Sequence, residues 1–278
     1  MNLARNFTRN TIFQVIFNSI FQVMVVLQTF ILSAAHHQVH NQNDVEQYWR
    51  KRPNCEGLSA VLWNNELYNG CVDKLQKELL MNILGERDNI KTVLDLGCGI
   101  GRLSKFLAQQ GYSVTAVDFE EMIRKAKQLN PHQNVEYLEI RMQDFKSMTH
   151  YDCVLCSAVL YTIHSWNELT KIINKTVRHL GCGYYILMEP FHTDPLLRRQ
   201  PCFSIGEITK FFESLGLKVV KKSGILFWPF RMVLANSKID SQRDMASLFE
   251  AGESIMRHFS PMLLSDYKVL ILAKSCSG

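Results

Sequence analysis

The chain has 278 residues, of which 47% are hydrophobic, 21% charged and 10% aromatic. This composition is typical of a globular protein and excludes a disordered chain, a collagen-like repeat and a coiled-coil rod. The 31 basic and 26 acidic residues leave a net charge of +5, which is too small to indicate a nucleic-acid partner by itself. The length is enough for one large domain with a sizeable core.

The first 43 residues differ from the rest. They contain two arginines and no acidic residue, and the run from Thr11 to Ala34 carries no charge. As a helix this run would extend roughly 36 Å, long enough for a bilayer core. The side chains of Gln14, Asn18 and Gln22 would place a polar stripe along one of its faces.

Four interpretations of this segment stay open. It is a membrane anchor through residues 11–34, a helix in the membrane interface or against a partner, a targeting segment, or an extension upstream of a start at Met24. Residues 36–43 are typical of a polar linker. We therefore expect two parts: a hydrophobic segment with its linker over residues 1–43, and a folded domain over residues 44–278.

The eight cysteines are scattered along the chain, which favours reduced thiols and a cytosol-like compartment. Cys153-x-x-Cys156 has the spacing of a metal or redox pair. It lies within an apolar run, residues 151–160, that predicts a strand, and a strand would send these two side chains to opposite faces. We therefore expect no metal site.

After residue 44, apolar runs alternate with helical patterns, which predicts βαβ units and a parallel sheet. We predict seven strands: Thr92–Leu96, Ser113–Val117, Val135–Ile140, Tyr151–Ser157, Tyr184–Met188, Lys218–Lys222 and Lys268–Lys274. The predicted helices are Arg102–Gln110, Glu120–Gln128, Trp166–His179, Ile205–Leu215 and Ser241–His258. An inserted segment separates the last two strands.

The first strand runs into three alternate glycines, Gly97, Gly99 and Gly101, and then into a helix. Glycines allow a tight turn and let a ligand approach the backbone, and a helix N-terminus offers free N–H groups to an anion. Asp118 ends the next strand, where an acid in a doubly wound fold accepts hydrogen bonds from two ribose hydroxyls. The alternative role of Asp118 is the N-cap of the following helix.

A dinucleotide-binding enzyme has the fingerprint G-x-G-x-x-G, whereas this turn is G-x-G-x-G, with Arg102 in place of the last glycine. About 45 further residues precede the first strand in the predicted domain. Both observations disfavour hydride transfer.

Residues 92–189 resemble the class I S-adenosylmethionine-dependent methyltransferases. Asp95 and the three glycines match the D-x-G-x-G-x-G stretch after strand one of that family, and Asp118 matches the acid at the end of strand two. The resemblance implies an α/β, Rossmann-like sheet of seven strands in the order 3-2-1-4-5-7-6, with helices on both faces. It also implies S-adenosyl-L-methionine as cofactor.

The resemblance extends to the strands that follow. Residues 143–145 match the segment after strand three, whose acid accepts from the adenine amine; residues 156–160 match the segment that lines the methionine arm; and residues 180–183 match the glycine turn into strand five. The implied cofactor contacts are Asp95, Gly97, Cys98, Gly99, Gly101, Asp118, Phe119, Gln143, Asp144, Phe145 and Ser157.

The segment Ser157–Tyr161 lacks the proline pair of family members that methylate planar amines, which disfavours a nucleic-acid acceptor. With His164 close behind, it resembles the branch that includes the ubiquinone and menaquinone methyltransferases, which implies a small, partly apolar acceptor. The Tyr48-Trp49 pair and two other short matches resemble the protein N-terminal methyltransferases, so a protein acceptor stays open. A cofactor-binding protein without turnover is the third alternative.

In this fold the acceptor contacts come from the N-terminal helix and from segments after strands four, five and six, here residues 48–84, 161–166, 191–203 and 225–264. The aromatic cluster at residues 227–230 lines an apolar pocket or caps the sheet edge. The general-base candidates are His164, His192 and Glu189, and none is assigned as catalytic. Because S-adenosylmethionine is an intracellular metabolite, we expect the domain to face the cytoplasm.

Overall fold

The computed structural model describes residues 42–85, 87, 89–191 and 203–275. The predictions for residues 1–41, for His192 and for most of the segment 191–203 therefore lie outside the described residues. Among the helices of the described residues, none has the length and hydropathy needed to cross a bilayer. Helix α2 (Gln42–Lys51) begins within the last two residues of the predicted linker.

Seven strands form one sheet in the order β3-β2-β1-β4-β5-β7-β6, as predicted. The strands are β1 (Thr92–Leu96), β2 (Ser113–Asp118), β3 (Val135–Glu139), β4 (Tyr151–Ser157), β5 (Leu180–Glu189), β6 (Leu217–Phe227) and β7 (Ser265–Lys274). Strands β1 to β5 pair in parallel, and β7 runs antiparallel to both of its neighbours. The carboxyl ends of the parallel strands therefore meet at one edge of the sheet.

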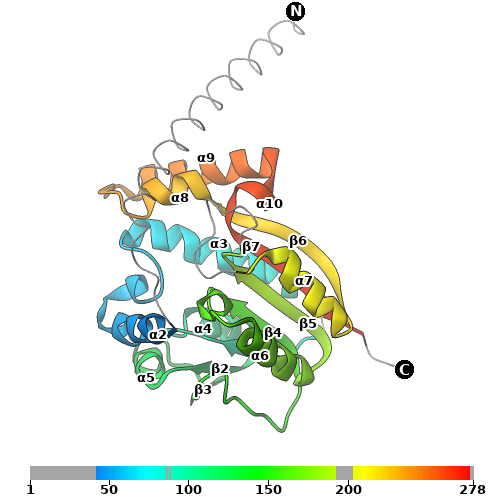
Figure 1. Ribbon diagram of the computed structural model, residues 1–278. Coiled ribbons are helices and arrows are strands. Elements are labelled where there is room, and N and C mark those ends of the chain that lie inside the picture. The colour runs from blue at the N-terminus through cyan, green and yellow to red at the C-terminus, as the bar shows by residue number, and fades with distance from the viewer. Residues whose placement is uncertain (1–41, 86, 88, 192–202, 276–278) are drawn as a thin grey trace, which may run out of the picture. The chain divides into compact units, whose positions relative to one another are not determined.

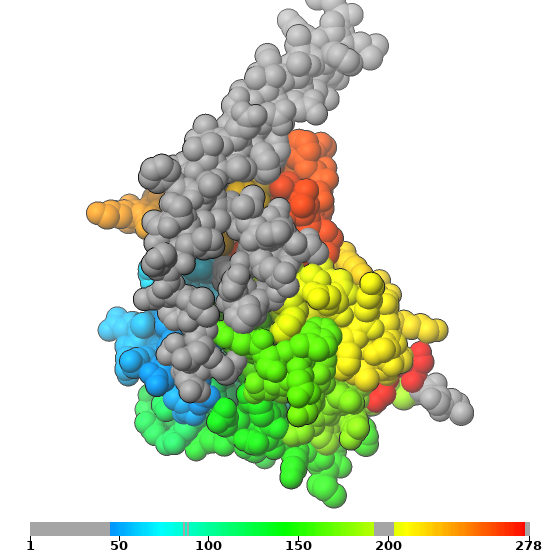
Figure 2. Space-filling model, in the orientation of Figure 1, coloured from blue at the N-terminus to red at the C-terminus, as the bar shows by residue number. Residues whose placement is uncertain are grey.

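Helices cover both faces of the sheet. The first hydrophobic core receives side chains from α3 (Glu66–Leu84), α4 (Arg102–Gln109), α5 (Glu120–Leu129), α8 (Trp228–Leu234) and α9 (Gln242–Phe259). The second receives side chains from α6 (Trp166–Arg178) and α7 (Ile205–Ser214), which lie in front of the sheet in Figure 1. In the space-filling view the green and yellow parts of the chain adjoin on this face (Figure 2). The rings of Trp166 on α6 and Phe211 on α7 pack with their centroids 5.8 Å apart.

The central strands alternate between the two cores, as strand geometry requires. On β4, Cys153 and Leu155 belong to the first core, and Val154 and Cys156 belong to the second. The prediction that the two cysteines point to opposite faces is confirmed.

The thiols are not all reduced, which corrects one sequence prediction. Cys182, exposed at the start of β5, is disulfide-bonded, whereas the five cysteines Cys55, Cys71, Cys98, Cys153 and Cys156 are free.

Strand β6 is longer than predicted because it pairs with β7 from Leu217 to Phe227, and β5 is longer because it also pairs with β4 through Leu180 and Tyr151. The predicted glycine turn at residues 180–183 is wrong: these residues are the first four of β5. Gly183 is needed for close packing, since a Cβ there would lie 1.8 Å from the backbone oxygen of Asp152. The irregularity in the β4–β5 pairing, between the Tyr151–Leu180 and Cys153–Tyr184 pairs, is next to this contact.

Side-chain caps mark the starts of several helices. Asn65 accepts from the N–H of Tyr68 at α3, and Ser204 and Glu207 form a capping box at α7. The segment between β6 and β7 holds α8, α9 and the short α10 (Pro261–Leu264), where the sequence predicted an insertion with one helix.

Candidate functional site

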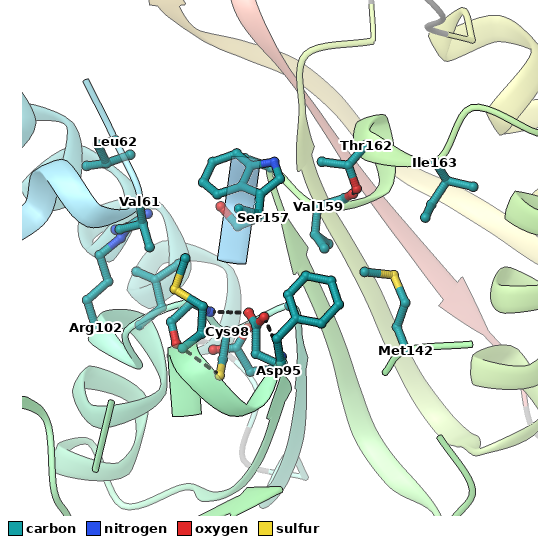
Figure 3. A pocket seen from close by; sticks show the side chains of 18 of the residues that line it. Val61, Leu62, Asp95, Cys98, Arg102, Met142, Ser157, Val159, Thr162 and Ile163 are labelled. Atoms are coloured by element: carbon teal, nitrogen blue, oxygen red, sulfur yellow. Dashed lines mark hydrogen bonds between the residues drawn. The ribbon is translucent and has the colours of Figure 1, made fainter. Parts of the chain in front are cut away.

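A cavity lies at the carboxyl ends of β1, β2 and β4. The turn after β1, the end of β2 and the residues after β4 form its floor, while α2, the segment before α3 and Tyr267 of β7 complete the wall. Figure 3 shows the labelled side chains of Val61, Asp95, Ser157 and Val159 around this space. In an open α/β sheet, this edge is where ligands bind.

The turn after β1 needs its glycines. Gly97, Gly99 and Gly101 have φ angles of 73°, 57° and 75°, in the left-handed region that side chains disfavour. Space is also lacking: a Cβ on Gly97 would lie 2.2 Å from Val159, and one on Gly99 would lie 2.6 Å from Val61. The backbone of Gly97 and Gly99 therefore lies directly against the cavity, and α4 begins directly behind the turn.

Asp118 presents a half-buried carboxylate to the cavity. Its Oδ2 accepts from the N–H of Gly99 at 2.7 Å, and its Oδ1 accepts from the N–H of Phe119 at 2.7 Å. Burial raises the pKa of this carboxyl to about 6, although the two N–H groups lower it. The alternative role as a helix N-cap is wrong, because Phe119 is the N-cap residue of α5 and no side chain caps that helix.

Asp95 lies deeper, with 2% of its surface exposed. Its Oδ2 accepts from the hydroxyl of Ser104 at 2.6 Å. Burial raises the pKa of Asp95 to about 6, which the Ser104 hydrogen bond and the charge of Arg102 partly oppose. The cavity thus contains two carboxyls that protonate more readily than exposed ones.

The cavity brings together eight of the eleven predicted contact residues: Asp95, Gly97, Cys98, Gly99, Asp118, Phe119, Gln143 and Ser157. Three others lie outside its lining. Gly101 stands at the start of α4, Asp144 is exposed, and Phe145 is buried in the second core beside Tyr151.

The two general-base candidates in the described part of the chain, Glu189 and His164, do not line the cavity. The buried carboxylate of Glu189 accepts from the N–H groups of Val159, Leu160 and Tyr161, at 2.9, 3.0 and 3.3 Å. Burial raises the pKa of Glu189 to about 7. Glu189 therefore holds the segment after β4, where Ala158 has a φ of 55°. His164 is not among the lining residues either.

The aromatic cluster at residues 227–230 does not line the cavity. Phe227 and Trp228 are buried, and Phe227 packs 5.3 Å from Phe230 between ring centroids. Both rings lie against Gly252 of α9, so the apolar-pocket alternative is wrong for this cavity. Helix α9, in the insertion between β6 and β7, covers these rings. The sequence of the aromatic cluster alone could not predict this contact.

Four lining residues were not named individually from the sequence. Glu46, Trp49, Gln76 and Tyr267 come from elements outside the matched stretch, residues 92–189, although Trp49 and Gln76 lie in the predicted acceptor segment, residues 48–84. The Tyr48-Trp49 pair had been noted in the sequence. In the structure Tyr48 is exposed, and Trp49 lines the cavity. Nothing in the local pattern around Gln76 or Tyr267 marks them as lining residues.

An antiparallel last strand, inserted between the fifth and the sixth, distinguishes this sheet from the dinucleotide-binding folds. It is the fold of the class I S-adenosylmethionine-dependent methyltransferases, and it agrees with the motifs that resemble that class. S-adenosyl-L-methionine is the cofactor of the class.

Comparisons with known proteins agree. Residues 93–183 match the family described as a methyltransferase domain. Phosphoethanolamine N-methyltransferase 1 of Zea mays is 27% identical over 155 residues, which cover 54% of this chain and 30% of that protein. A ubiquinone biosynthesis O-methyltransferase of Pseudomonas fluorescens is 37% identical over 124 residues, which cover 42% of this chain and 52% of that protein.

The chain thus spans less than two thirds of the length of these relatives. Among solved structures, magnesium protoporphyrin IX methyltransferase from Synechocystis PCC 6803, with bound SAM, has a TM-score of 0.55 and 17% sequence identity. That match covers 86% of this chain and 99% of the other and shows the shared fold.

Proposed function

We propose that this chain transfers a methyl group from S-adenosylmethionine to an O, N or C nucleophile of a small, partly apolar acceptor. The observation that carries the proposal is the Asp118 carboxylate, oriented by two backbone N–H groups beside a side-chain-free glycine turn. A nucleoside with an amino-acid arm needs such a pair: an acceptor for ribose hydroxyls and a backbone surface that the arm can approach.

The surroundings of Asp118 fit this cofactor. Phe119, Met122 and Met142 supply apolar surface for a flat base, and Gln143 lies in the same lining. Gln143 is also fixed, because its amide donates to Glu168 at 2.7 Å. Asp144 has an exposed side chain, so the predicted contact with the adenine amine has to be tested directly.

When bound, the cofactor supplies an activated methyl group on a sulfonium. The residues of the chain would align the nucleophile with it and exclude water. Val61, Leu62, Val159 and Ile163 give the wall an apolar character, and Tyr267 adds a ring with a polar end. This lining supports a partly apolar acceptor, and it contains no assigned catalytic base.

The names of the relatives support a small molecule as acceptor. Those matched include enzymes of ubiquinone biosynthesis and a phosphoethanolamine methyltransferase, and no observation favours the protein N-terminal alternative or a binding protein without turnover. The acceptor atom is part of the proposal and is left open among O, N and C.

The test is methyl uptake in a cell extract. The 278-residue chain is incubated with methyl-labelled S-adenosylmethionine and extract, and the labelled product is separated into lipid-soluble, water-soluble and protein fractions. We expect label in a small molecule that dissolves at least partly in organic solvent. Label in protein supports the protein alternative, and cofactor binding without label in any fraction contradicts the enzyme proposal.

We also propose that the domain faces the cytoplasm, where S-adenosylmethionine is made, and is held at a membrane by residues 11–34. The uncharged sequence of that run supports this. Cell fractionation tests it: unprocessed full-length protein found only in the soluble fraction contradicts membrane attachment.

A further inference from the structure

Gln76 of α3 connects three elements around the cavity. Its side chain is fully buried and lines the cavity. Its Oε1 accepts from Arg102 Nη2 at 2.5 Å, and its Nε2 donates to Ser157 Oγ at 3.3 Å. Arg102 is the first residue of α4 and Ser157 is the last residue of β4. A single amide thus joins α3, the helix after the glycine turn and the end of β4.

The direction of these hydrogen bonds is fixed by chemistry. A guanidinium has only donors, so the atom of Gln76 that faces Arg102 is the carbonyl oxygen. The amide NH2 then faces Ser157, and because it too can only donate, the serine oxygen accepts. Arg102 cannot turn away, since its Nη1 donates to Asp73 at 2.8 Å and its side chain is 10% exposed.

Ser157 is therefore left with a hydroxyl proton to donate. Among the described residues, its only hydrogen bond through the side chain is the one that it accepts from Gln76. Ser157 lines the cavity, and Figure 3 shows it with Arg102 among the lining side chains. A buried or half-buried hydroxyl is rarely left without an acceptor, which indicates that a ligand oxygen completes this chain of hydrogen bonds.

The charge of Arg102 selects the kind of oxygen. Its guanidinium lies in the same lining as the Ser157 hydroxyl, and the Asp73 carboxylate that it contacts is shared with Lys77, at 2.5 Å. Arg102 is the basic residue of the described lining, and its guanidinium and the Ser157 hydroxyl contact the same Gln76 amide. A hydroxyl donor close to a guanidinium suits an anionic oxygen.

We propose that Gln76 is a positioning residue that keeps Ser157 as a hydrogen-bond donor to the carboxylate of the cofactor's methionine end. This inference rests on the proposed function, which supplies that carboxylate. Gln76 itself acts through Ser157.

The variants Gln76→Glu and Ser157→Ala test it. The substituted glutamate keeps the contact with Arg102 but turns the donor facing Ser157 into an acceptor, so the serine proton points to the new carboxylate and away from the ligand. We expect both variants to bind S-adenosylhomocysteine about tenfold or more weakly by calorimetry. The double variant should bind no more weakly than Ser157→Ala alone, because both changes remove the same donor.

Two controls separate the loss of the hydrogen bond to the carboxylate from a general loss of binding and from the effect of an added negative charge. 5′-Methylthioadenosine lacks the carboxylate, so its affinity should be the same in all variants. Gln109→Glu adds the same charge at an exposed position on α4 and should leave both affinities unchanged. Thermal midpoints of each variant show whether it folds; if Gln76→Glu does not, the comparison is made with Ser157→Ala and the two ligands.

The outcomes are distinct. Additive losses in the double variant would mean that the carboxylate introduced by Gln76→Glu repels the ligand directly, which overturns the inference. Equal weakening of 5′-methylthioadenosine, or unchanged affinity for S-adenosylhomocysteine in Ser157→Ala, overturns it as well. Failure of the unmodified chain to bind S-adenosylhomocysteine contradicts the proposed function instead.

Discussion

The backbone N–H of Gly99 donates to Oδ2 of Asp118 at 2.7 Å, so the glycine turn after β1 and the acid at the end of β2 position each other. Phe119 donates a second backbone hydrogen bond to the other carboxylate oxygen. Backbone donors thus hold both oxygens of a carboxylate that lines the cavity. The glycine turn and Asp118, which are separate motifs in the sequence, are thus joined by a hydrogen bond in the fold.

The substitution Asp118→Ala should weaken the binding of S-adenosylhomocysteine strongly. The two ribose hydroxyls would lose their acceptor, and each charge-assisted hydrogen bond contributes roughly 1.5–3 kcal/mol, about ten- to hundredfold in affinity. Calorimetry measures this directly. Asp240→Ala is the control: its exposed side chain lies outside the cavity lining, so we expect unchanged affinity. Asp144→Ala tests the predicted adenine contact, and weaker binding by that variant would support it.

The substitution Gly99→Val should abolish cofactor binding and leave most of the fold intact. A side chain there requires a backbone with φ of 57° and meets Val61 at 2.6 Å, inside the cavity lining. Gly111→Ala is a matched control, because its φ is 95° but no atom lies within 4 Å of the added Cβ. That control should lose some stability and no affinity. If Gly99→Val binds S-adenosylhomocysteine normally, the cofactor lies elsewhere.

Local sequence patterns predicted the strands and the glycine turn because β1, β2 and β4 are short apolar runs with buried side chains. They could not predict the full length of β6, which depends on antiparallel pairing with β7, far away in the chain. Gln76 was missed for the same reason. A glutamine on a helix predicts an exposed side chain, and only tertiary packing shows that this one lies between Arg102 and Ser157.

The buried acids should make the protein less stable as the pH rises. The pKa of Asp95 is raised to about 6 and that of Glu189 to about 7, mainly by burial, whereas both titrate near pH ~4 in an unfolded chain. Between about pH 4 and pH 7 the native state binds more protons than the unfolded state. The free energy of unfolding therefore falls as the pH rises through this window.

Glu189→Gln tests this, because an amide does not titrate. The thermal midpoint of the variant should depend less on pH between about 5 and 7.5 than that of the unmodified chain, even if one hydrogen bond to the segment after β4 is lost. Glu78→Gln, at an exposed position on α3, should leave the pH dependence unchanged. Identical pH slopes for Glu189→Gln and the unmodified chain would show that Glu189 is charged in the native state.

Helix α2 is held over the cavity by Arg50, and we expect the affinity for the cofactor to depend on it. Arg50 contacts Glu121 at 2.8 Å, and its guanidinium lies 4.6 Å from the centroid of the Phe119 ring. Because these groups are partly exposed, Arg50→Met should weaken S-adenosylhomocysteine binding only about threefold, and less at high salt. Lys74→Met, which breaks an exposed pair with Glu78 on α3, should have no effect.

The last prediction concerns residues 1–40, which the sequence separates from the domain. Residues 41–278 form one compact unit with its own two cores, so deleting residues 1–40 should leave the thermal midpoint and the affinity for S-adenosylhomocysteine unchanged. The amides at Gln14, Asn18 and Gln22 are costly in lipid without partners, yet the run around them is long enough to span. We therefore expect the deletion to move the protein from the membrane fraction to the soluble fraction. A truncated chain that unfolds or loses the cofactor would instead mean that the segment packs on the domain, and equal distribution of both forms between the fractions would contradict the anchor.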